Sequence, residues 1–262
     1  MNFSGTNDVI QALSDYKLAL YLAWADIRQR YRRSTLGPFW ITISTAVMVA
    51  SMGLIFGNIF KSPLNVFLPF LATGLITWRF ISTTIHESTS VFSDSEAIIK
   101  QLPIPLFTHV LRMIFRNVII YVHNFIIIPL TILILNSEIN FDIFLFLPGF
   151  LLLFINLSWI SLLLGIICSR YRDVSQIISS LLQIVFYVTP IMWMPSMLPQ
   201  RASTMIIDLN PMYYLIQIVR APWLATTPNF EDWFASLLIA FLGWTATLIV
   251  FNKYKNSIPY WV

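Results

Sequence analysis

The sequence has few charged residues and a single cysteine. Charged residues make up 11% of its 262 positions, and the cysteine is Cys168. This scarcity of charge excludes an ordinary soluble domain, in which about a quarter of the residues are charged. One cysteine excludes an intrachain disulfide and a cysteine-rich metal site. We interpret Cys168 as a buried, inert thiol.

Several chemical motifs are also missing. The chain has no glycine-rich loop followed by Lys-Ser or Lys-Thr, so it cannot hold ATP phosphates by that route. Its histidines, His86, His109 and His123, are too dispersed to indicate a metal site. The motifs of zinc proteases and serine hydrolases are absent. We interpret Glu231 and Asp232, beside the last apolar stretch, as a solvated helix start. These absences predict a chain that is not an enzyme and has no metal or cofactor of its own.

Hydrophobic residues, in contrast, are abundant. They make up 57% of the chain, and the mean hydropathy is +0.74. They gather in stretches of about twenty residues, which at ~1.5 Å per residue cross a hydrocarbon core of ~30 Å. We predict an all-α polytopic membrane protein with one domain, 1–262, and six transmembrane helices within 38–252. The predicted spans are Pro38–Phe60, Phe67–Ile85, Met113–Leu135, Phe144–Cys168, Ile177–Met197 and Trp233–Asn252.

The basic residues fall on alternate connections between these spans. Twelve lie in the N-terminal, second, fourth and C-terminal segments: Lys17, Arg28, Arg30, Arg32, Arg33, Lys100, Arg112, Arg116, Arg170, Arg172, Lys253 and Lys255. The remaining connections hold three: Lys61, Arg201 and Arg220. Because cytoplasmic loops carry the excess of Lys and Arg, both termini are predicted to be cytoplasmic.

The segment before the first span has its own pattern. Apolar residues recur every three or four positions, as on one face of a helix: Leu13, Tyr16, Leu20, Trp24, Ile27 and Tyr31. Other faces carry Arg28, Arg30, Arg32 and Arg33. We predict an amphipathic interface helix at about 10–34, with its arginines near anionic lipid. The alternative is an ordinary basic cluster that only sets topology. Nucleic-acid binding is not expected, because no soluble module presents these cations.

An ordered set of strings follows this segment along the chain. The strings are Tyr31–Trp40 (YRRSTLGPFW), Asp94–Pro105 (DSEAIIKQLPIP), Ser169–Val174 (SRYRDV), Thr189–Trp193 (TPIMW), Leu198-Pro199, Asn210–Met212 (NPM) and Arg220. The set resembles polysaccharide-exporting ABC permeases, particularly the membrane subunits that export O-antigen. The resemblance implies two copies of this chain with the path between them. It also implies two nucleotide-binding ATPase subunits, which carry the ATP and Mg²⁺.

The resemblance further assigns two cytoplasmic segments to coupling with the ATPase subunits. In the first, a short coupling helix precedes a turn that contains prolines. The residues concerned are Asp94, Glu96, Lys100, Gln101, Arg170, Arg172 and Asp173. Read alone, Pro103 and Pro105 would only break a helix, and the second segment would be a solvated turn. After the fifth span, external re-entrant helices are expected at about 195–228.

Aromatic side chains on the first and fifth spans are candidates for the substrate path, because sugars stack their C–H faces on aromatic rings. In related exporters these two spans line the path. The candidates are Phe39, Trp40, Phe56, Phe60, Phe186, Tyr187 and Trp193. Core packing and lipid contact are the alternatives for each of them.

Arg79 lies within the second predicted span. An arginine there costs about 2.5–3.5 kcal/mol on insertion scales. It should therefore face a protein interior, a water-filled path or an acidic partner, and Glu87 is too far along the helix to pair directly. One interpretation is a contact with the anionic head of a lipid-linked glycan. The other is a structural hydrogen-bonding arginine or a misplaced span boundary.

Together these observations predict an inner-membrane permease subunit of an ABC exporter. Its expected substrate is undecaprenyl-diphosphate-linked O-antigen polysaccharide for lipopolysaccharide assembly. Capsular polysaccharide or teichoic acid is the alternative within the same class. An ion-driven secondary transporter would be favoured by inverted repeats and midplane acids. An intramembrane glycosyltransferase or acyltransferase would be favoured by a catalytic His or acid pair at one membrane face. Neither pattern is present.

Overall fold

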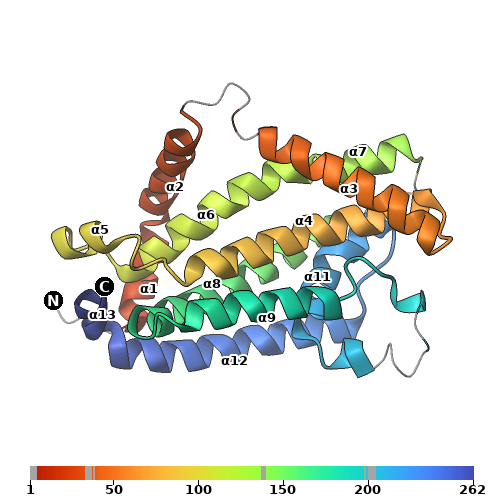
Figure 1. Ribbon diagram of the computed structural model, residues 1–262. Helices are drawn as coiled ribbons and strands as arrows, with labels where there is room; N and C mark the ends of the chain where they lie inside the picture. The colour runs from red at the N-terminus through yellow and green to blue at the C-terminus, as the bar shows by residue number, and fades with distance from the viewer. Residues whose placement is uncertain (1–4, 33–36, 38, 137–139, 198, 200–204) are drawn as a thin grey trace.

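The computed structural model describes residues 5–32, 37, 39–136, 140–197, 199 and 205–262. Over these residues the chain is an elongated bundle of helices without a β-strand (Figure 1). The helices are α1 (Gly5–Ser14), α2 (Tyr16–Arg30), α3 (Phe39–Ile59), α4 (Leu64–Ser88), α5 (Glu96–Gln101), α6 (Leu106–Phe125), α7 (Ile127–Ile134), η1 (Phe141–Leu145), α8 (Phe146–Arg170), α9 (Val174–Val188), η2 (Pro195–Met197), α11 (Pro211–Arg220), η3 (Ala221–Leu224), α12 (Phe230–Tyr254), η4 (Lys255–Ser257) and α13 (Ile258–Trp261).

Five helical segments of the described chain are long and apolar enough to cross a membrane. They are Phe39–Ile59, Leu64–Ser88, Leu106–Ile134, Phe141–Arg170 and Phe230–Trp261. They coincide with the first, second, third, fourth and sixth predicted spans. The all-helical architecture is therefore confirmed for the described residues, and so are five segments of spanning length.

The fifth predicted span, Ile177–Met197, ends too far along the chain. The helix here is α9, which has 15 residues and stops at Val188. Thr189 is extended, with ψ of 135°. A residue before a proline is pushed out of the helical region by the proline ring, and Pro190 follows directly. At ~1.5 Å per residue α9 is about 22 Å long, shorter than the hydrocarbon core.

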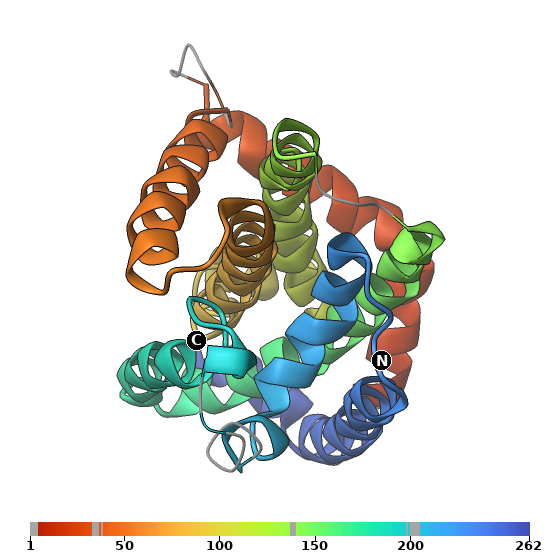
Figure 2. The same cartoon turned by 90° about the vertical axis from the view of Figure 1, so that its right-hand side faces the viewer.

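Helix α4 is the centre of the bundle, whereas its neighbour α3 lies at the edge (Figure 2). Of the most apolar stretch of α4, 72% is buried, compared with 17% for α3. Helix α4 packs against α3, α6, α8, α9 and α11. Its Phe67, Leu71 and Ile81 join Leu157 of α8 and Leu215 of α11 in one hydrophobic core. The core thus fixes α4 and leaves most of α3 uncovered.

The predicted single interface helix at about 10–34 is two helices, which meet at Asp15. Helix α2 packs against α6 through its small and apolar residues Ala19, Ala23 and Ile27. Four members of the predicted apolar stripe are exposed instead: Leu13, Tyr16, Leu20 and Trp24. This exposed stripe is available to lipid, and its place at the membrane surface stays a prediction. Arg33 and Pro38 lie outside the described residues.

Helix α1 is fixed by a buried acid. The Asp8 side chain is 3% exposed, and its carboxylate accepts the backbone N–H groups of Leu106 and Phe107 at 3.1 and 3.0 Å. Lys255 pairs with it at 3.1 Å. The first N–H groups of a helix have no partner within it, and the helix dipole favours an anion there. Asp8 therefore caps α6 and ties both ends of the chain to it.

Helices η2, α11 and η3 lie within the predicted re-entrant region, 195–228. The Asn210 side chain accepts the Met212 N–H at 3.0 Å and donates to the Thr189 hydroxyl at 2.8 Å. Helix α11 then packs between α4, α8 and α12. A Cβ on Gly149 of α8 would come within 2.4 Å of the Ile218 carbonyl oxygen, so a glycine permits this close approach. The insertion of these helices into a bilayer stays a prediction.

Candidate functional site

A groove of about 390 Å³ runs between α3, α4 and α9. We call it the lateral groove. Its lining residues are Met48, Met52, Leu75, Trp78, Arg79, Ser82, Leu182, Gln183 and Phe186. The first, second and fifth predicted spans thus come together at one site. Two of the predicted path residues, Arg79 and Phe186, line this groove.

Arg79 is exposed in the groove, although most of α4 is buried. Its Nη1 donates to the Thr45 hydroxyl on α3 at 3.0 Å. Among the described residues it makes no ion pair, and Glu87 is paired with other arginines. The prediction that Glu87 does not pair with Arg79 is confirmed. Among the described residues Thr45 is the one acceptor of its guanidinium, which has five N–H donors, so Arg79 retains unused hydrogen-bonding capacity.

The fifth-span aromatics gather at the C-terminal end of α9. The ring centroids of Trp78 and Phe186 are 5.8 Å apart, and those of Phe186 and Tyr187 are 5.4 Å apart. The Trp193 Nε1 donates to the Tyr187 carbonyl at 3.2 Å. The Tyr187 side chain is 64% exposed. The structure therefore places an aromatic surface beside the cation of the groove.

The first-span aromatics lie at the two ends of α3, outside the groove lining. Phe56 stacks on Phe60, with centroids 5.8 Å apart, and Phe60 meets Phe67 edge-on. At the other end Phe39 contacts His123 of α6 at 5.7 Å, and Trp40 is 60% exposed. Their part in a substrate path stays a prediction.

The two predicted coupling segments lie at the same end of the bundle, beside α13 (Figure 1). Glu96 pairs with Lys100 at 2.6 Å. Lys100, followed by the more distant Arg172 of the second segment, lowers the pKa of the Glu96 carboxyl below its ordinary value. Arg170 packs over the Trp261 ring at 5.3 Å.

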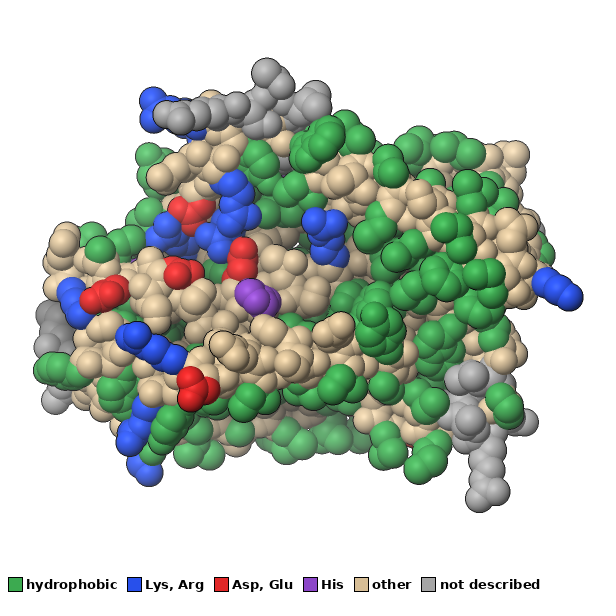
Figure 3. Space-filling view, in the orientation of Figure 1, with side chains coloured by type: hydrophobic (Ala, Val, Ile, Leu, Met, Phe, Trp, Pro, Cys, Tyr) green, Lys and Arg blue, Asp and Glu red, His purple; other side chains and the backbone are tan. Residues whose placement is uncertain are grey.

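The other predicted coupling residues face solvent. Asp94 accepts a hydrogen bond from the Ser90 hydroxyl at 2.8 Å, and it is exposed. Gln101, Arg172 and Asp173 are also exposed. Among the described residues no group of three His, Cys, Asp or Glu side chains could hold a metal ion. Charged side chains gather toward this end of the bundle (Figure 3), and their contact with an ATPase subunit stays a prediction.

Comparison with known proteins decides the class. The sequence matches the ABC-2 type transporter family over residues 17–224, most of the chain. The chain belongs to this family. It is 25% identical to each of two O-antigen export system permease proteins of Klebsiella pneumoniae, over 92% of this chain and 93% of each relative. It is 23% identical to the O-antigen export system permease protein of Myxococcus xanthus, over 81% of this chain and 83% of the relative.

The ABC-2 family and the apolar helices together establish a multi-pass membrane protein that serves as a permease subunit of an ABC transporter. Membrane subunits of this family work with a separate ATPase. The expected family is confirmed.

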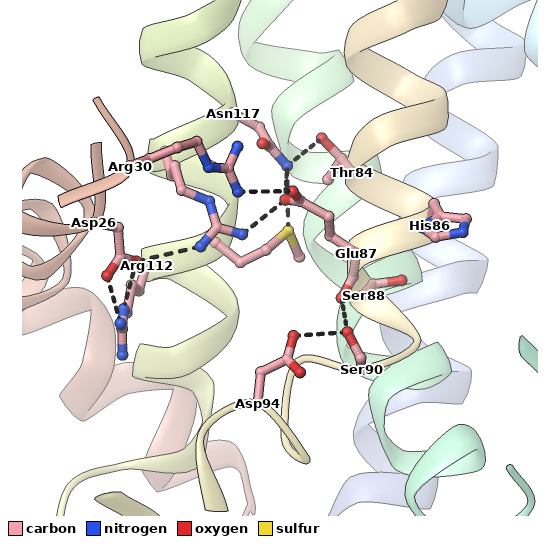
Figure 4. Close-up of polar contacts among 12 residues, drawn as sticks. Asp26, Arg30, Thr84, His86, Glu87, Ser88, Ser90, Asp94, Arg112 and Asn117 are labelled. Atoms are coloured by element: carbon pink, nitrogen blue, oxygen red, sulfur yellow. Dashed lines mark hydrogen bonds and ion pairs between the residues drawn. The ribbon is translucent and has the colours of Figure 1, made fainter. Parts of the chain in front are cut away.

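A network of charged residues joins α2, α4 and α6 of this ABC-2 permease (Figure 4). The Arg112 guanidinium makes two hydrogen bonds to Asp26, one of them from Nε at 2.8 Å. Arg116 lies between the two acids, 3.3 Å from Asp26 and 2.8 Å from Glu87. Arg30, predicted to lie near lipid, is 3.6 Å from Glu87. We call these five residues the arginine network.

In the sequence, Arg112 and Arg116 served only as basic residues in the prediction of topology, and their ion pairs were not predicted. They are spaced four apart on one helix, so they share a face, and that spacing could have predicted a common acidic partner. The partners lie about 90 and 30 residues away in the chain. That pairing becomes visible only in the fold. The network fixes α2 to the core of the permease.

Arg220, at the end of α11, differs both from Arg79 and from the ion-paired arginines of the network, because it is buried. Its side chain is 2% exposed. Nη1 donates to the Pro190 carbonyl at 2.7 Å, Nη2 donates to the Gln217 side chain at 2.7 Å, and the guanidinium covers the Phe70 ring at 4.2 Å. It was counted above as a cation of an outer connection, and the structure shows that it is buried. Arg220 holds the Pro190 turn against α11 and α4.

Proposed function

We propose that this ABC-2 permease subunit exports an undecaprenyl-diphosphate-linked O-antigen polysaccharide across the bacterial inner membrane. The observation that carries the proposal is the match to O-antigen export permeases over about nine-tenths of both chains. The aromatic surface of Trp78, Phe186 and Tyr187 supports it, because aromatic rings suit the C–H faces of sugars. A surface with few hydrogen bonds to the glycan would allow a long polymer to slide.

The active transporter contains two copies of this chain and two ATPase subunits. The sparse burial of α3 supports the pairing of copies, because one copy leaves most of this helix without a protein partner. The lateral groove beside α3 then faces the path between the copies. ATP and Mg²⁺ bind the ATPase subunits, which dock on α5 and on the α8–α9 turn. Membrane lipids cover the rest of the apolar surface.

Co-expression and complementation test this proposal. The chain alone should show no ATPase activity, whereas co-expression with its ATPase should give a stable complex that hydrolyses ATP. The pair should restore surface O-antigen to a strain that lacks its own exporter and makes the cognate glycan. ATP hydrolysis by the uncontaminated chain, or a stable complex that restores no O-antigen, contradicts the proposal.

Both termini and the coupling end are cytoplasmic in this proposal. Cys168 is buried, so a Cys168→Ser background removes the natural thiol at an internal site. The exposed positions Asp173 and Thr227 then receive single cysteines. In intact spheroplasts an impermeant thiol reagent should label the Thr227→Cys chain and not the Asp173→Cys chain. The opposite labelling inverts the topology.

A further inference from the structure

Helix α4 presents one narrow polar face within an otherwise buried span. Within residues 67–88, all of which the structure describes, Arg79 and His86 are the only exposed residues. They are about two helical turns apart and therefore share a face. Ser82 lies between them on the same face and lines the lateral groove. A span that is otherwise buried or half-buried thus exposes a cation and an imidazole, with a half-buried hydroxyl between them.

Helix α9 presents a matching face. Its Gln176, Ser179 and Gln183 recur at helical spacing and are all exposed. Gln183 lines the lateral groove together with Arg79. Helices α4 and α9 pack against each other and run in opposite directions. The two polar faces therefore lie along one lane, which enters the groove at Arg79 and Gln183.

Among the described residues, no acid pairs with Arg79 or His86 of this lane. Glu87 is the nearest carboxylate in sequence, and Arg116 and Asn117 already bind it at 2.8 and 2.9 Å. Figure 4 shows His86 and Glu87 on opposite sides of α4. The lane is therefore cationic. A guanidinium with unused donors in a span favours an anion that can accept two parallel hydrogen bonds, as phosphate does.

We propose that Arg79, with Ser82 and Gln183, binds the diphosphate that joins the glycan to its lipid carrier. This inference rests on the proposed function and names the part of the substrate that the groove recognises. The diphosphate reaches Arg79 along the polar lane, past His86. The sugars next to it lie against the Trp78 and Phe186 rings, at the aromatic end of the groove. The lipid chain leaves between α3 and α9, the two helices that flank the opening.

Binding measurements on the full chain in phosphatidylcholine nanodiscs test the site. The probe is labelled undecaprenyl diphosphate, and the competitors are undecaprenol and inorganic pyrophosphate. Arg79→Gln should weaken binding by on the order of tenfold or more, since a hydrogen bond to a charged group contributes about 1.5–3 kcal/mol. The affinity of Arg79→Lys should lie between those of the wild type and Arg79→Gln, because an ammonium keeps the charge and loses the planar pair of donors. Undecaprenol should not compete, and excess pyrophosphate should.

Lys61→Gln is the control for loss of charge. It removes one positive charge from an exposed position between α3 and α4, outside the groove lining. It should leave the affinity unchanged, while gel filtration should show that each variant elutes as the wild type does. Equal affinity of the wild type and Arg79→Gln overturns the proposal. Equal weakening by Arg79→Gln and Lys61→Gln also overturns it, because binding is then a general effect of charge.

The complementation assay separates this inference from the function on which it rests. If the wild-type complex restores no O-antigen, the proposed function fails, whatever the binding data show. If it restores O-antigen while Arg79→Gln binds undecaprenyl diphosphate as tightly as the wild type, the function stands and the diphosphate site at Arg79 is wrong.

Discussion

Two arginines in two regions of this bundle are held in opposite ways. At the Pro190 turn, Arg220 is 2% exposed and has a carbonyl, an amide oxygen and an aromatic ring as partners. In the lateral groove, Arg79 is exposed and its side chain makes one hydrogen bond within the described residues, to the Thr45 hydroxyl. A cation among apolar helices is costly in both places. Where the protein supplies a full set of partners, the arginine holds the fold; where it does not, the site has capacity for a ligand.

Loss of Arg220 should have the largest effect on the fold. Arg220→Met leaves the Pro190 carbonyl and the Gln217 side chain without their partner in a buried site. We expect destabilisation by about 2–5 kcal/mol, because each buried group left unpaired costs about 1–3 kcal/mol. The membrane level and the melting temperature of the solubilised chain should both fall. Lys61→Gln, at an exposed cation, is the control. A wild-type melting temperature for Arg220→Met would remove the distinction between the two arginines.

The arginine network gives an intermediate case. Asp26→Asn keeps the shape of the side chain and removes the charge that Arg112 and Arg116 share. We expect a loss of about 1–3 kcal/mol, since these groups are only partly screened by solvent. A double-mutant cycle with Arg112→Gln should show coupling between the two positions. Additive effects would mean that Asp26 does not act through Arg112.

Arg79→Gln should separate fold from function. Its side chain is exposed and its partner is one hydroxyl, so we expect a change in unfolding free energy within about 0.5 kcal/mol. Surface O-antigen should nevertheless fall by on the order of tenfold, if a charge-assisted contact of about 1.5 kcal/mol is lost. The melting temperature of the solubilised chain checks the stability, and immunoblots of surface glycan check the export. If the melting temperature of Arg79→Gln falls as much as that of Arg220→Met, Arg79 is a structural residue.

The aromatic surface should contribute less per residue. Losing one stacking ring costs about 0.5–1.5 kcal/mol per contact. The double variant Tyr187→Ala/Trp193→Ala should therefore retain normal membrane levels and ATPase association while lipid-linked glycan accumulates inside the cell. Phe56→Ala, near the C-terminal end of α3, offers a comparison outside the groove lining. Full surface glycan in a stable double variant would exclude both rings from the path.

Glu96 should show the smallest effect on stability. Because Lys100 and then Arg172 lower its pKa, the carboxylate stays ionised at neutral pH. Any contribution to stability is present above its ordinary pKa and is lost as the pH falls through the lowered value. Glu96→Lys should not change the melting temperature, since the pair is exposed. It should reduce the ATPase rate of the complex, and an unchanged rate would remove α5 from the ATPase contact.

The features that could be predicted from the sequence are those that depend on hydrophobicity along the chain. Five spans follow from the length of their apolar stretches, and the exposure of Arg79 to a groove was one expected consequence of its cost in a span. The early end of α9 could also have been predicted, because Pro190 disfavours helix at Thr189. The burial of Arg220 could not. Its partner at Pro190 is 30 residues away, and its count as an outer cation assumed that it is solvated.

The capping of α6 by Asp8 has a consequence for the order in which the chain is assembled. Asp8 binds an N–H group 98 residues further along the chain, and Thr6 binds Asn252, 246 residues away. During synthesis α1 therefore leaves the ribosome long before the surfaces that it packs against exist. Helix α1 therefore gains its full set of contacts only after α12 has been made.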